Sequence, residues 1–213
     1  MGDKNMVSIK QVILKNNIQG IPKETDFELR TTTISTEIGD YNSNGGAVLL
    51  KNLYLACDPY LCHIMRSDEL LPFMHDIVPG SVVKGYGVAK VIKSGIEELK
   101  EGDYVWGITG WESFSWNLDP QKQLTKIHFT DDVPLSYYAG ILGMPGHGAY
   151  MGWNEMCYPK QGESVYVSSA AGGVGHLVGQ FAKMSGCYVV GSASCWNYVL
   201  NLKCNSQQYL VDC

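Results

Sequence analysis

Over residues 164–190, the pattern of apolar and polar residues predicts a strand, then a helix, then a second strand. Val165 and Val167 alternate with polar neighbours, and Tyr188–Val190 is again aromatic and β-branched, so both segments are predicted to be strands. Between them, apolar residues recur at helical spacing: Val174, Leu177, Val178, Phe181, Ala182 and Met184. Gly186 is predicted to close this helix. The pattern predicts a βαβ unit.

The first 130 residues show a different pattern. Short β segments broken by Gly, Pro and Asn are clearest at 47–57, 81–93 and 103–109, which predicts a compact, barrel-like β domain. Helical spacing appears only over Leu135–Met156, where Pro145 and Gly146 are expected to interrupt it. This segment is predicted to bridge two domains.

The turn between the predicted strand and helix is rich in small residues. Glycines there allow the backbone to approach a pyrophosphate, and the N–H groups and positive dipole of the helix start attract an anion. The motif differs from GxGxxG because Ser169 replaces the first glycine before Gly172 and Gly175. Its position between strand and helix favours a dinucleotide site over an ordinary glycine-rich turn.

The end of the second predicted strand bears on which dinucleotide is bound. An acid about 20 residues beyond the glycines binds the ribose of NAD, and that point is Ser192. Residues 191–194 contain no acid, which disfavours NAD and leaves room for the 2′-phosphate of NADP. No Arg or Lys lies between Cys187 and Leu202, so the cation expected beside that phosphate is missing.

Several stretches together resemble one family. They are QVIL (11–14), VLLKNLYLACDPYL (48–61), KGYGVAKVIKSG (84–95), EGDYVWGITGWESFS (101–115), VPLSYYAGILGMPGHGAY (133–150) and YPKQGESVYVSSAAGGVGHLVGQFAKMSGCYVVGSA (158–193). In order and spacing the chain resembles the plant NADPH-dependent alkenal double-bond reductases. These are relatives of the prostaglandin and leukotriene reductases among the zinc-free medium-chain dehydrogenases.

The resemblance implies an α/β chain of two domains: a β-rich, GroES-like catalytic domain over 1–134 and an incomplete Rossmann-type βαβ cofactor domain over 135–213. The tail diverges from about Ser194, and the lysine that would hold the 2′-phosphate falls at Tyr198. Strands three to six of the cofactor domain and a late tyrosine of the family are expected to be absent. Cofactor affinity and activity are therefore expected to be reduced.

The resemblance also implies an activity and its residues. The family uses NADPH to reduce the carbon–carbon double bond of α,β-unsaturated aldehydes and ketones. Tyr60 and Tyr86 correspond to tyrosines that border the substrate, and a phenol can donate a hydrogen bond to a carbonyl oxygen that gains charge. The cofactor residues implied are Met144, Ser169, Ala170, Gly172, Gly173, Val174, Gly175 and Ser194. His147 is interpreted first as a turn residue and second as a proton donor.

Composition and charge exclude several classes. The 213 residues carry a net charge of −5, and no Lys/Arg cluster supplies a nucleic-acid footprint. No apolar run is long enough for a membrane span, and the N-terminus lacks a signal-peptide core, so a cytoplasmic enzyme is expected. The seven cysteines are scattered without CxxC pairs, and Cys57, Cys62 and His63 are not expected to bind metal.

An alternative class stays open. Two parallel strands leave an open edge that favours association, so a homodimer is a further expectation. In the alternative, the chain is a non-catalytic interaction protein that keeps the β domain and acts through its exposed sheet edge.

Overall fold

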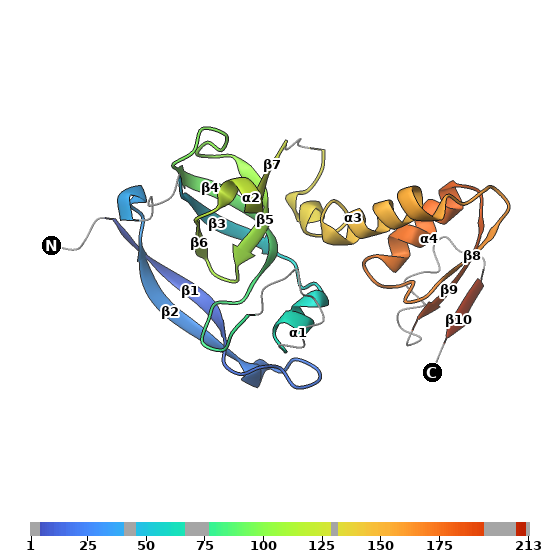
Figure 1. Ribbon diagram of the computed structural model, residues 1–213, viewed down its shortest axis with the longest axis horizontal. Coiled ribbons are helices and arrows are strands. Elements are labelled where there is room, and N and C mark those ends of the chain that lie inside the picture. The colour runs from blue at the N-terminus through green and yellow to red at the C-terminus, as the bar shows by residue number, and fades with distance from the viewer. Residues whose placement is uncertain (1–4, 41–45, 67–76, 129–131, 194–207, 212–213) are drawn as a thin grey trace. The chain divides into compact units, whose positions relative to one another are not determined.

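The computed structural model describes residues 5–40, 46–66, 77–128, 132–193 and the backbone of 208–211. These form two compact units, Met1–Ala139 and Gly140–Cys213, which are described separately below (Figure 1). The sequence-based boundary at 134/135 and the assignment of the domain types remain predictions. The mixed α/β class expected from the sequence is confirmed.

Unit 1 consists mainly of strands. A two-stranded sheet pairs β1 with β2, and a five-stranded antiparallel sheet has the order β6-β3-β4-β5-β7. The strands are β1 (Met6–Leu14), β2 (Phe27–Ser35), β3 (Val48–Leu55), β4 (Lys84–Ser94), β5 (Tyr104–Gly110), β6 (Phe114–Asn117) and β7 (Leu124–Ile127). The short helices are η1 (Glu24–Asp26), η2 (Ile38–Asp40), α1 (Tyr60–Ile64), α2 (Pro120–Gln123) and η3 (Leu135–Ala139). The three strands predicted from the sequence are confirmed as β3, β4 and β5.

Two buried clusters hold unit 1 together. One lies on the five-stranded sheet and is formed by Val48, Leu50, Ala89, Val91, Leu99, Val105 and Leu124. The other joins β1, α1 and the segment before β4, and its members are Leu14, Ile18, Leu61, Ile64, Met65, Ile77 and Val83. Tyr60 and Trp111 pack against this second cluster. It therefore fixes α1 beside the start of β4.

Unit 2 contains the predicted βαβ unit. Its elements are α3 (Met144–Met151), the π-helix η4 (Gly152–Cys157), β8 (Ser164–Val167), α4 (Gly175–Met184), β9 (Tyr188–Ala193) and β10 (Gln208–Val211). β8 and β9 are parallel, and α4 packs against both (Figure 1). Gly186 adopts φ +76° and donates its N–H to Lys183, while Cys187 donates to Ala182. This is the Schellman arrangement, so the predicted role of Gly186 is confirmed.

Two expectations for unit 2 are wrong. The sheet has a third strand, because β10 pairs in parallel with β9 in the order β10-β9-β8. The helical run over Leu135–Met156 is interrupted as expected, because η3 ends at Ala139 and α3 begins at Met144, but Pro145 and Gly146 themselves lie in α3, where a proline in the first turn costs no hydrogen bond. His147 is consequently a helical residue and not a turn residue.

Candidate functional site

The glycine turn of unit 2 links the end of β8 to the start of α4. Ser169 has φ +49°, and its carbonyl accepts the N–H of Gly172 at 2.8 Å. Ala170 is buried and donates its N–H to the carbonyl of Ser192 on β9 at 2.8 Å. The turn is therefore fixed to both strands of the βαβ unit.

The start of α4 lies very close to this turn. A Cβ on Gly175 would overlap the carbonyl oxygen of Ser169 and lie 2.9 Å from Cα of Ala170, so only glycine fits. Within the described residues, the N–H groups of Gly173, Val174 and Gly175 donate no hydrogen bond, and no side chain caps the helix. Free N–H groups at a helix start suit an anionic phosphate. The residues present fit the pyrophosphate of a dinucleotide.

The beginning of α3 borders the same turn. Met144 is the first residue of α3, and a Cβ on Gly173 would lie 3.3 Å from Cβ of Pro145. His147 is exposed and donates its backbone N–H to Gly143. The structure thus brings the segment around Met144 to the glycine turn within unit 2.

The end of β9 carries no charged side chain. Ser192 is buried, and its hydroxyl lies 2.7 Å from that of Tyr166 on β8. The contact between Tyr166 and Ser192 was not predicted from the sequence. Tyr166 lies between Val165 and Val167, the two alternating valines of β8. Ser194 and Tyr198 lie outside the described residues. The described strand end offers neither the acid that NAD favours nor a cation.

The two tyrosines predicted in unit 1 lie near one another. Tyr60 begins α1 and Tyr86 lies on β4; their ring centroids are 6.2 Å apart in an edge-to-face arrangement. The Tyr86 ring also stacks on Trp106, with centroids 4.8 Å apart and an angle of 14° between the planes. Stacking holds the Tyr86 ring in one orientation. Both predicted residues thus belong to one aromatic group.

Four of the buried polar atoms that have no hydrogen-bond partner among the described residues lie at the same end of the sheet. They are Asp58 Oδ2, Tyr60 Oη, Thr109 Oγ1 and Trp111 Nε1. β3 ends, β4 begins and β5 ends in this region, because Ala56 donates to the Tyr86 carbonyl and Trp111 donates to that of Val83. Native proteins leave few such atoms unsatisfied, so a group of them indicates a ligand site. We call these four residues the orphan cluster.

Thr109 and Trp111 were missed by the sequence analysis, and Asp58 was not assigned to the site. A threonine and a tryptophan at a strand end have ordinary structural roles, and only the structure shows that their polar atoms are buried. A polar residue at the end of an apolar strand is the one signal that the sequence offered.

Burial sets the ionisation of the two acidic groups of the cluster. It raises the pKa of the Asp58 carboxyl above its ordinary value. Burial, with a contribution from the Asp58 charge, raises the pKa of Tyr60 to about 12. The nearby Tyr86 backbone lowers this pKa in part, although its geometry is not that of a hydrogen bond. Tyr60 is therefore a phenol donor at neutral pH.

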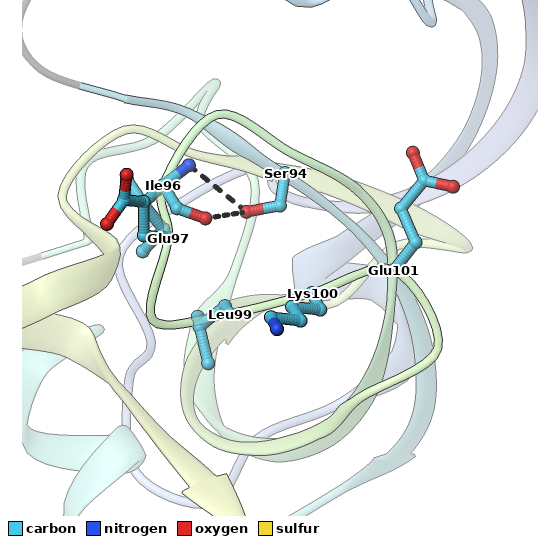
Figure 2. A pocket seen from close by; sticks show the side chains of 6 residues that line it. All are labelled: Ser94, Ile96, Glu97, Leu99, Lys100 and Glu101. Carbon is cyan, nitrogen blue, oxygen red and sulfur yellow. Dashed lines mark hydrogen bonds between the residues drawn. The ribbon is translucent and has the colours of Figure 1, made fainter.

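The surface hollows in the described part of unit 1 include one of about 450 Å³ and one of about 220 Å³. The larger of these two is lined by Ser94, Ile96, Glu97, Leu99, Lys100 and Glu101. Figure 2 shows the Ser94 hydroxyl bound to the backbone of Ile96 in this hollow, and none of the orphan cluster lines it. The smaller hollow, about 220 Å³, includes Thr109 and Lys84 and therefore adjoins the cluster.

Within the described ranges, no group of three or more His, Cys, Asp or Glu side chains has the arrangement of a metal site. In the same part of the chain, no helix combines the length and apolar character needed to cross a bilayer.

The chain matches known oxidoreductases in sequence. Residues 10–127 match the family model described as the N-terminal domain of oxidoreductase. The chain is 55% identical over 187 residues to 2-alkenal reductase (NADP(+)-dependent) of Nicotiana tabacum, covering 88% of this chain and 53% of that protein. It is 52% identical over 190 residues to (+)-pulegone reductase of Mentha piperita, covering 88% and 54%.

Solved structures of other proteins also match this chain. CurA from Vibrio vulnificus has a TM-score of 0.81 at 28% identity, covering 95% of this chain and 57% of that one. CurA in complex with NADPH has a TM-score of 0.79 at 26% identity, with the same coverage. The chain spans about half the length of the curated relatives it matches.

Proposed function

Because the chain belongs to the oxidoreductase family defined by this N-terminal domain, we propose that it takes part in NADPH-dependent reduction of the carbon–carbon double bond of α,β-unsaturated aldehydes or ketones. The observation that carries this proposal is the 55% identity, over 88% of the chain, to a 2-alkenal reductase. The tyrosines and the glycine turn supply residue types that this chemistry needs.

The cofactor role falls to unit 2. The N–H groups of Gly173, Val174 and Gly175 bind the pyrophosphate, and Ser169 and Ala170 shape the turn that presents them. Gly172 and Met144 border the same binding surface, and Ser194 completes the proposed set. When bound, NADPH supplies the hydride.

The substrate role falls to unit 1. The hydroxyls of Tyr60 and Tyr86 donate hydrogen bonds to the carbonyl oxygen as that oxygen gains negative charge. Tyr60 keeps its proton at neutral pH, because its pKa is raised to about 12. The buried surroundings strengthen such a hydrogen bond. A proton is then added at the α-carbon.

A second function is favoured by one observation. β8 is an edge strand of its sheet, and Tyr166 on it is 60% exposed. An exposed edge strand can pair with another chain. The alternative is therefore a non-catalytic interaction protein, and a homodimer through this edge is compatible with either function.

Location and partners complete the proposal. Cys57, Cys62, Cys157 and Cys187 are free thiols in the described part of the chain, which agrees with a reducing cytoplasm. The net charge of −5 favours a small-molecule partner over nucleic acid.

One experiment separates the two functions. The full chain is incubated with a small enone and NADPH that carries deuterium at the transferable position, and the product is identified by mass spectrometry. A saturated ketone with deuterium at the β-carbon supports the reductase. An allylic alcohol contradicts double-bond reduction, and no product together with no NADPH binding favours the interaction protein.

A further inference from the structure

Trp111 has a buried indole N–H without an acceptor among the described residues. Its backbone is fixed on both sides, because its N–H donates to Val83 at 2.7 Å and its carbonyl accepts from Val12 at 2.8 Å. The ring packs against the same apolar cluster as Tyr60. The indole is therefore held in place while its one polar atom is left unsatisfied.

Two other indoles in the described part of the chain donate to acceptors within the protein. Trp116 donates its Nε1–H to the carbonyl of Ser35 at 2.9 Å, and Trp153 donates to the Ser185 hydroxyl at 3.2 Å. Buried Trp side chains usually find such a partner. The indole N–H of Trp111 has no such partner among the described residues, so its acceptor has to come from elsewhere, for example from a bound ligand.

A glycine lies next to this N–H. A Cβ on Gly85 would lie 3.5 Å from Trp111 Nε1 and 3.3 Å from a methyl of Leu61. Gly85 immediately precedes Tyr86, and Leu61 immediately follows Tyr60. The buried indole N–H thus lies next to a residue without a side chain, between the segments that carry the two proposed substrate residues.

We propose that Trp111 binds the carbonyl oxygen of the substrate through its indole N–H, beside Tyr60. This inference rests on the proposed function, since it concerns the same α,β-unsaturated carbonyl. An indole N–H can only donate, and Tyr60 donates while protonated. A carbonyl oxygen that gains negative charge can accept more than two hydrogen bonds, so the indole N–H adds to those of the tyrosine hydroxyls.

The direct test observes the indole N–H. The full chain, labelled with ¹⁵N at its tryptophan indoles, is titrated with 2-cyclohexen-1-one, and the signals are assigned with Trp111→Phe and Trp116→Phe. We expect the Trp111 signal to move downfield and that of Trp116 to stay. Cyclohexene, which lacks the carbonyl, should leave both in place.

Kinetics give a second readout. Trp111→Phe keeps an aromatic ring and removes the donor, so kcat/KM should fall by about 10²-fold. Trp116→Phe is the matched control and should keep its kcat/KM. Gly85→Ala places a methyl group beside the indole N–H. This variant should therefore also bind the enone more weakly than the unaltered chain.

The outcomes separate the two claims. Enone binding or turnover with an unmoved Trp111 signal overturns the role of Trp111 and leaves the proposed function intact. Absence of both binding and turnover in the unaltered chain contradicts the proposed function itself, and the inference with it.

Discussion

Gly175 and Ser169 approach so closely that a side chain at position 175 would overlap the Ser169 carbonyl oxygen. This contact joins the first turn of α4 to the end of β8 and keeps three backbone N–H groups together at the helix start. The tightest packing of the turn thus coincides with its proposed anion site, and a small substitution there tests both.

Gly175→Ala should destabilise the chain by about 1–3 kcal/mol, because the added methyl group overpacks the turn. NADPH binding should be lost as the N–H groups move apart. Thermal unfolding and a cofactor titration measure the two effects.

The matched control is Gly179→Ala in the same helix, where a Cβ meets only Val189 at 4.0 Å. The control should be stabilised by up to about 1 kcal/mol. Unchanged NADPH affinity in Gly175→Ala would remove the turn from the site.

The unaltered chain should bind NADPH more tightly than NADH. No acid stands at the end of β9 over 191–193 to bind a ribose diol, and the Ser192 hydroxyl is engaged by Tyr166. The preference should be small, because that strand end also lacks a cation for the 2′-phosphate. Paired titrations by calorimetry measure the ratio of the two dissociation constants. Tighter binding of NADH would show that the strand-end argument is wrong.

Tyr86→Phe should lower kcat for enone reduction by about 10²-fold, because one hydrogen-bond donor to the developing charge is lost. The ring remains, so its stack on Trp106 and the fold should persist. Steady-state kinetics and thermal unfolding are compared for the variant. Tyr104→Phe on β5 is the control, and its kcat should stay unchanged. An equal loss in both variants would indicate a general structural effect.

The sequence predicted the elements that have a local cause. Alternating valines identified β8, helical spacing identified α4, and Gly186 identified the helix end, because each signal lies within the element itself. Pro145 correctly indicated a break in the helical run, but proline is unfavourable inside a helix and suited to its first turn, so the sequence alone placed His147 in a turn rather than in α3. The position of Pro145 relative to the start of α3 decides between these two effects.

Features with a tertiary cause were not predictable from the sequence. β10 exists through its pairing with β9, and the segment 208–211 is too short for periodicity to indicate a strand. The orphan state of Thr109 and Trp111 depends on what surrounds them after β3, β4 and β5 have assembled. Tyr60 and Tyr86 were found only through the family resemblance, because tyrosine is common in strands.

Asp58→Asn should stabilise the chain at neutral pH. A carboxyl whose pKa is raised in the folded state favours folding in acid, and this contribution is lost as pH rises through the folded pKa. The variant removes the buried charge, and the gain should be below about 1 kcal/mol because water still screens this group. Urea unfolding at pH 7 and at about pH 3 measures it, and the gain should vanish in acid. Asp119→Asn, which breaks an exposed pair with Lys122, should show no gain.

Tyr60 should ionise well above the ordinary value for a tyrosine. Its pKa is raised from 10.0 to about 12, chiefly by burial. In the unfolded chain it ionises near the ordinary value, so its contribution to stability is complete below about pH 10 and is lost as pH rises toward 12. The ¹³Cζ signals of labelled tyrosine report each phenol, and Tyr60→Phe identifies the signal of Tyr60. At about pH 11 that signal should still be in its protonated position. Ionisation of Tyr60 near pH 10 in the folded chain would mean that its hydroxyl is open to water, and the proposed buried donor to the substrate carbonyl would lose its basis.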